Sequence, residues 1–240
     1  MRGVFVTGTD TGVGKTLFSA ALLLRLGAAG VQAAACKPVS AGCRRAGGRL
    51  VNADAELLAA VAPAARSLEI VNPVAFEPAI APHIAAAEAG ARLAAADLVA
   101  ACRAAAAGAE YLVVEGAGGW RVPLGDSGSL ADVAVGLQLP VVLVVGLRLG
   151  CLNHALLSAE AIRADGLHLA GWVANPLAAA MPRLEENIAT LAHRLGAPLA
   201  RLPACDAATE GGRARQAAAA LPADLLARLP GVNHAWRGTQ

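Results

Sequence analysis

The sequence has no apolar run long enough to cross a lipid bilayer. Its longest uncharged stretch, 166–182, contains His168, Asn175 and two prolines, whereas a membrane helix needs about 20 predominantly apolar residues. The opening residues, MRGVFVTG, include no long apolar segment of the kind found in secretion signals. We therefore expect a cytoplasmic protein with no membrane partner.

Cysteines and charged residues are also sparse. The five cysteines are odd in number and form no CxxC pair, which favours reduced packing residues over a disulfide framework. Charged residues make up 16% of the chain, the net charge is +2, and no basic run is interleaved with aromatic residues. This pattern argues against nucleic acid as a partner and favours small molecules as the partners.

Apolar residues, in contrast, make up 56% of the 240 residues, which excludes intrinsic disorder and provides for one sizeable core. Continuous apolar runs, typical of parallel strands buried on both faces, alternate with helix-length stretches. The expected strands are 4–7, 33–37, 111–115, 141–146, 169–175 and 199–203, and the expected helices are 16–29, 53–62, 94–107, 153–164 and 183–194. This alternation predicts an α/β fold with a doubly wound, mostly parallel sheet.

The chain contains no linker that would indicate a second domain. We expect a single domain over 1–229, followed by a tail at 230–240 that has no periodicity and frays. The short polar segment 42–52 is predicted to be a mobile loop.

The segment GTDTGVGKT, 8–16, follows the first apolar run and fits the pattern G-x-x-x-x-G-K-[ST]. Glycines let the backbone N–H groups of such a loop turn towards a phosphate. Lys15 then reaches the β- and γ-phosphates, and the Thr16 hydroxyl is a ligand for Mg²⁺. The motif predicts an ATP or GTP site in a P-loop NTPase-like fold. Loops of the partitioning and nitrogenase-iron ATPases carry a lysine near position 10, where this chain has Asp10, which argues against a motor or positioning ATPase.

Two acids are candidates for the metal that accompanies a nucleotide. Glu115 ends the apolar run YLVVE and is followed by Gly116-Ala117-Gly118, where the backbone can pass close to phosphates. Asp54, in the segment NADAELL, is the second candidate. For Asp54 the sequence leaves a competing interpretation open, an acid that stabilises the first turn of a helix.

These segments, taken with others in the same order, resemble the dethiobiotin synthetases, the ATP-dependent family that closes the ureido ring of biotin's precursor. The matching segments span about two-thirds of the chain; they are GTDTGVGKT (8–16), KPV (37–39), NADA (52–55), NPVAF (72–76), PH (82–83), VEGAGGW (114–120), VGLRLGCLNHA (145–155) and GWVAN (171–175). The resemblance implies a homodimer that acts on 7,8-diaminopelargonate, CO₂ or bicarbonate, and ATP with Mg²⁺. It also implies a substrate site that spans the dimer interface.

The resemblance further implies a role for individual residues. Lys37, Lys15 and Thr11 would be catalytic, and Thr16, Asp54 and Glu115 would bind the metal. The nucleotide site would comprise Gly12, Val13, Gly14, Lys15, Thr16, Leu17, Asp54, Glu115, Gly116, Ala117, Gly118, Asn175, Pro176, Pro203, Ala204, Cys205 and Glu210. The diamine site would comprise Thr11, Lys37, Ser40, Ala41, Gly150, Cys151 and Asn153, the last three binding the substrate carboxylate at a helix N-terminus.

Three questions remain open at this level. Relatives have serine at the position of Ala41, and this chain has Ser40 instead, so the substrate hydrogen bond is either re-aimed or lost. His83 lies either near the substrate or in the scaffold. A regulatory P-loop ATPase with a protein partner, or an amidoligase of the cobyrinate type, is the alternative function.

Overall fold

The computed structural model describes residues 1–126, 128–177 and 181–232. A sheet of six parallel strands forms its centre, in the order β10-β9-β8-β1-β7-β2. The strands are β1 (Gly3–Gly8), β2 (Ala33–Cys36), β7 (Tyr111–Glu115), β8 (Val141–Leu147), β9 (Leu169–Pro176) and β10 (Ala200–Arg201). The direction of winding reverses at β1, which lies between β7 and β8. Ligands bind beside such a reversal, at the carboxyl ends of the strands.

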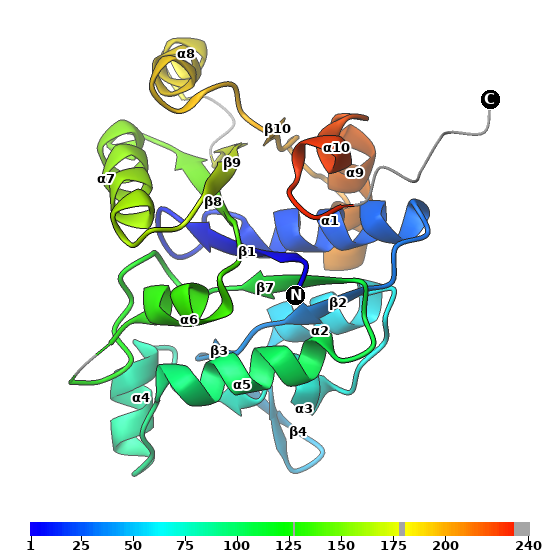
Figure 1. The fold of residues 1–240 in the computed structure, drawn as a ribbon, viewed down its shortest axis with the longest axis vertical. Coiled ribbons are helices and arrows are strands. Elements are labelled where there is room, and N and C mark those ends of the chain that lie inside the picture. Colours follow the sequence, from blue (N-terminus) through cyan, green and yellow to red (C-terminus); the bar gives the residue numbers. More distant parts are fainter. Residues whose placement is uncertain (127, 178–180, 233–240) are drawn as a thin grey trace.

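Helices cover both faces of this sheet (Figure 1). They are α1 (Lys15–Ala28), α2 (Ala53–Val61), α3 (Leu68–Val71), α4 (Pro82–Glu88), α5 (Ala95–Ala106), α6 (Leu130–Leu137), α7 (Cys151–Ala164), α8 (Leu184–Leu195), α9 (Glu210–Ala220) and α10 (Leu225–Arg228). Successive residues of β1 face opposite sides: Phe5 joins the core beneath α5, α6 and α7, whereas Val4 and Val6 join the core beneath α1, α2 and α9. The predicted doubly wound α/β fold is confirmed.

Two small sheets lie outside the central one. Strands β3 (Val39–Ser40) and β6 (Val74–Ala75) pair in parallel, and β4 (Arg44–Ala46) and β5 (Arg49–Val51) form an antiparallel hairpin. The prediction of a loop at 42–52 is therefore wrong, since most of this segment forms paired strands. Gly47 and Gly48 both adopt positive φ, which suits the tight turn of a hairpin.

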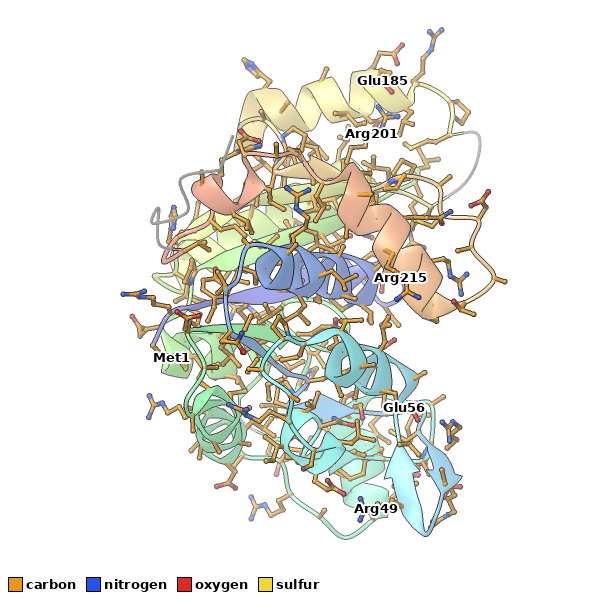
Figure 2. All side chains as sticks on the ribbon, turned by 90° about the vertical axis from the view of Figure 1, so that its right-hand side faces the viewer. Met1, Arg49, Glu56, Glu185, Arg201 and Arg215 are labelled. Atoms are coloured by element: carbon orange, nitrogen blue, oxygen red, sulfur yellow. The ribbon has the colours of Figure 1, made fainter. Side chains whose placement is uncertain are left out.

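Ion pairs fasten this hairpin to the helices beside it. Arg44 pairs with Glu56 of α2, and Arg49 pairs with Glu69 of α3. Figure 2 labels Arg49 and Glu56 on this side of the molecule. It also labels Glu185 of α8 and Arg201 of β10, which pair at 2.6 Å at the other end of the molecule. All these pairs are exposed, so each stabilises the fold only modestly.

Several boundaries differ from the prediction. Helix α7 begins at Cys151 rather than residue 153, because Gly150 takes a left-handed conformation that ends the preceding loop. The strand expected at 199–203 is limited to Ala200–Arg201. Helix α6 was not expected, because its apolar residues run on into those of β8; Ser129 and Asp132 mark its start with reciprocal capping hydrogen bonds. Of the predicted tail, 233–240 lie outside the described residues. No helix in the described part of the chain is long and apolar enough to span a bilayer.

Candidate functional site

The predicted phosphate loop connects the end of β1 at Gly8 to the start of α1 at Lys15. Gly14 has a φ of 93°, which an L side chain rarely adopts. A Cβ atom at Gly14 would also lie 2.2 Å from the side-chain nitrogen of Asn175. Only glycine fits this position, so the loop has the tight backbone path that a phosphate cradle requires.

Lys15 lies across the mouth of this loop. Its Nζ donates to the carbonyl oxygen of Asp10 at 2.9 Å and to that of Gly118 at 2.7 Å. Burial lowers the pKa of Lys15 to about 8, although the nearby Glu115 carboxylate opposes this shift. Its two acceptors are neutral carbonyls, so a bound phosphate would offer the ammonium a stronger partner.

Lys37 follows the last residue of β2 and is buried between two carboxylates. Its Nζ lies 2.6 Å from Glu115 Oε1 and 2.9 Å from Asp54 Oδ2. Burial by itself would lower the pKa of Lys37, but attraction to Glu115 and Asp54 raises it. The same attraction lowers the pKa of Asp54 against its own burial. Lys37 is therefore a fixed cation.

The carboxylates and the Thr16 hydroxyl form a set of oxygen atoms that fits Mg²⁺. Thr16 Oγ1 donates to Glu115 Oε1 at 2.8 Å, while the buried Glu115 Oε2 has no hydrogen-bond partner in the described part of the chain. Among those residues, no three His, Cys, Asp or Glu side chains gather to hold a metal on their own. Two carboxylates and a hydroxyl are nevertheless enough for a magnesium ion that also binds phosphate.

The loop after β8 reaches the same edge of the sheet. Arg148 forms an ion pair with Asp10, and the donation from the Thr11 backbone N–H, with Arg148, lowers the pKa of Asp10. Gly150 caps α7, Cys151 is buried beneath it, and Asn153 is exposed in its first turn. The predicted carboxylate-binding residues thus start a helix of 14 residues beside the phosphate loop.

The residues predicted to complete the nucleotide pocket differ in how they lie relative to the phosphate loop. Asn175, buried at the end of β9, donates through Nδ2 to the carbonyl of Val13 at 2.8 Å, and Pro176 is the last residue of that strand. Pro203, Ala204 and Cys205 form the loop after β10. Glu210 begins α9 and pairs with Arg213 of the same helix. The structure therefore brings Asn175 against the phosphate loop and leaves Glu210 in a contact within its own helix.

Ser40 and Ala41 follow Lys37 along the chain. The Ser40 hydroxyl is buried, donates to Asn72 Oδ1 at 2.7 Å and lies 3.2 Å from the Cys43 sulfur. Ala41 is partly exposed. His83, on α4, lines a cavity of about 180 Å³ with Arg92 and Asp126.

Two features of the site were not identified from the sequence. Asn72 contacts both Lys37 and Ser40, yet the segment NPVAF gave no hint of which side chain does so. The second feature could have been read directly: Lys15 and Lys37 are the only lysines among 20 basic residues. Both are buried at this site, whereas arginine supplies the basic residues elsewhere.

Comparison with known proteins identifies the family of this chain. A family profile described as an AAA domain matches residues 2–211. The ATP-dependent dethiobiotin synthetase BioD of Pseudomonas aeruginosa is 57% identical over 211 residues, covering 87% of this chain and 92% of the relative. The protein of that name from Cellvibrio japonicus is 55% identical over 197 residues, covering 82% and 86%.

Among solved structures, the septum site-determining protein MinD of Pyrococcus horikoshii, complexed with Mg-ADP, has a similar fold. It matches with a TM-score of 0.55 and 17% identity, covering 96% of this chain and 91% of that one. At this identity the likeness concerns the fold alone. From the identities to the bacterial relatives, the chain belongs to the ATP-dependent dethiobiotin synthetase family.

Proposed function

We propose that this protein catalyses the ATP-dependent carboxylation and ring closure of 7,8-diaminopelargonate to dethiobiotin. One amine takes up CO₂ and loses a proton, giving a carbamate. A carbamate oxygen attacks the γ-phosphorus, ADP leaves, and a carbamic–phosphoric anhydride forms. The second amine then attacks the carbonyl carbon and loses its proton, inorganic phosphate leaves, and the five-membered urea closes.

The placement of Lys37 is the observation that supports this function most. The carbamate and the γ-phosphate are both anionic, so they approach each other only where positive charge offsets their repulsion. Lys37 is a buried cation beside the phosphate loop, and its raised pKa keeps it protonated through the neutral range. Its proposed role is therefore charge neutralisation and positioning, with no proton transfer of its own.

The neighbouring residues have complementary roles. Lys15 holds the β- and γ-phosphates, and Thr11, in the same loop, contacts the carbamate. Asn175 lies against Val13 of the loop, and we assign its remaining amide hydrogen-bonding capacity to the adenine ring. Pro176, Pro203, Ala204, Cys205 and Glu210 are proposed to line the rest of the nucleotide site.

Mg²⁺ fits this site and would be held by Thr16, Asp54 and Glu115. Bound there, it would supply charge neutralisation for the phosphate oxygens. The orphaned Glu115 Oε2 supports this assignment, since a buried carboxylate oxygen without a partner is costly. Lys37 contacts two of these three side chains, Asp54 and Glu115, so its ammonium would lie beside the bound metal.

We further propose that the protein acts as a homodimer, with the substrate carboxylate bound at the N-terminus of α7 from the partner subunit. Helices α4 and α7 lie on the same side of the molecule (Figure 1). Leu149, directly before Gly150, is 98% exposed, and Leu157 of α7 and Ile84 of α4 are exposed as well. A second subunit covering these residues would support a carboxylate site at Gly150, Cys151 and Asn153.

Measuring the substrates required for ATP hydrolysis tests this function. Release of ADP should require both the diamine and bicarbonate, with little release when either is left out. ADP release that needs neither, and that a protein partner stimulates, would support the regulatory P-loop ATPase instead. Release with other amino-acid or carboxylate substrates in place of the diamine would support the amidoligase alternative.

A further inference from the structure

Lys37 lies at a break between two sheets. Strand β2 of the central sheet ends at Cys36, and β3, which belongs to the small parallel sheet, begins at Val39. Lys37 and Pro38 between them belong to neither ladder, and proline has no backbone N–H to donate. Something other than sheet pairing must therefore hold the backbone that carries the Lys37 side chain.

Residues 71 and 72 provide this support. The Lys37 backbone N–H donates to the carbonyl of Val71 at 2.7 Å. The side-chain nitrogen of Asn72 donates to the Lys37 carbonyl at 2.7 Å and to the Val74 carbonyl at 3.2 Å, and its oxygen accepts from the Ser40 hydroxyl at 2.7 Å. Both backbone groups of Lys37 are thus paired with this segment.

An asparagine suits these three contacts chemically. Its NH₂ group offers two donors, matched here by two carbonyl oxygens, and its oxygen accepts from a hydroxyl. Asn72 is only 8% exposed, so water cannot replace the contacts freely if they are removed. An aspartate of the same shape would keep the Ser40 contact but turn a charged oxygen towards two carbonyls.

The two ends of Lys37 are therefore fixed independently. Its ammonium is held by Glu115 and Asp54, and its backbone is held by Val71 and Asn72. A lysine side chain is long and flexible. When Glu115 and Asp54 bind other partners, the position of the Lys37 ammonium therefore depends on the position of the Lys37 backbone.

We propose that Asn72 is a positioning residue that sets the backbone of Lys37, and through it the place where the ammonium meets the reacting groups. This inference rests on the proposed function, in which Lys37 neutralises the carbamate and the γ-phosphate. Ser40 has a lesser role in this positioning. Its hydroxyl donates to the Asn72 side-chain oxygen and contacts neither the backbone nor the ammonium of Lys37.

The test compares Asn72→Ala and Asn72→Asp with Ser40→Ala and with Leu225→Ala, a core change in α10 that lies outside the segments described above. Steady-state kinetics, ATP affinity and melting temperature are measured for each variant. Because the chain has two lysines, ¹³Cε-lysine labelling gives two side-chain NMR signals, assigned with Lys15→Arg.

Both Asn72 variants should lower kcat by about 10–100-fold, the cost of displacing a catalytic group by about 1 Å. Their ATP Kd should stay within about threefold of the wild type, or ~0.6 kcal/mol. The Lys37 NMR signal should move while the Lys15 signal stays. Ser40→Ala, which removes one of the three Asn72 contacts, should lower kcat less than either Asn72 variant does. Leu225→Ala should keep the wild-type kcat even if its melting temperature falls.

The inference is overturned if both Asn72 variants keep kcat within about threefold, or if both lysine signals move alike. It is also overturned if neither variant folds, since the contacts would then serve folding alone. Failure of the wild-type protein to make dethiobiotin would instead reject the proposed function. In that case the Lys37 signal would still report whether Asn72 holds this backbone.

Discussion

Replacing Lys37 by methionine would remove a cation from between two carboxylates. The Lys37 side chain is 6% exposed and that of Glu115 is fully buried. Removing one partner of a buried ion pair costs about 3–5 kcal/mol, because the other charge is left without compensation. Asp54 is 45% exposed and turns to water instead, so it adds little to this loss.

The melting temperature of Lys37→Met should therefore fall on the order of 10 °C below that of the wild type, since a chain of this size loses about 2–4 °C per kcal/mol. Added Mg²⁺ without nucleotide should recover part of the loss, because the divalent cation can take the place of the ammonium between Glu115 and Asp54.

Differential scanning calorimetry with and without Mg²⁺ measures both effects. Lys15→Met, which removes the chain's other lysine, is the matched control: Lys15 Nζ contacts two backbone carbonyls and no carboxylate. The control should melt near the wild type, and Mg²⁺ should raise its melting temperature no more than it raises that of the wild type. The reasoning fails if Lys37→Met melts within about 2 °C of the wild type, or if Mg²⁺ shifts all three proteins equally.

Three further outcomes are expected. ATP affinity should fall above about pH 8, because Lys15 has a pKa of about 8 and must be protonated to hold phosphate. The Kd for ATP should rise by up to about tenfold per pH unit, and this rise should vanish in Lys15→Arg. A wild-type Kd that is constant from about pH 7 to pH 9.5 would contradict the prediction. Glu115→Gln should lower turnover in a way that high Mg²⁺ or Mn²⁺ partly restores, because one metal charge is lost while the shape is kept; an unchanged Mg²⁺ dependence would show that Glu115 is no ligand. Mixing Asn153→Ala with Lys37→Gln subunits should regenerate active sites if the two residues meet across a dimer interface, and the absence of any recovery would place them in the same subunit.

The parts of the fold that sequence reasoning predicted are those governed by local patterns. The run YLVVE became β7 with the expected bounds, and the phosphate loop has its predicted strand–loop–helix context. Such runs are visible because each strand is buried on both faces and so is apolar at every position. Helix α6 was missed because the apolar residues of 130–137 continue into those of β8, and a helix and a buried strand look alike in such a run.

Contacts between distant residues were harder to predict. The sequence suggested that Lys37, Asp54 and Glu115 share a site, but not that Lys37 bridges the other two, because residues 17 and 78 positions apart are joined only by the tertiary fold. Asn72 gave no local signal at all, since its partners are two carbonyls and a hydroxyl of other segments. The hairpin at 44–51 was hidden by its arginines, whose ion pairs with α2 and α3 replace an apolar face.

The fate of isotopically labelled bicarbonate tests the central claim most directly. The protein is incubated with 7,8-diaminopelargonate, [¹³C]bicarbonate and MgATP, and ¹³C NMR and mass spectrometry follow the label while ADP is measured in parallel. The account predicts dethiobiotin labelled at its ureido carbonyl, with one ADP and one phosphate released for each labelled product. Release of ADP with no label in any urea would contradict it.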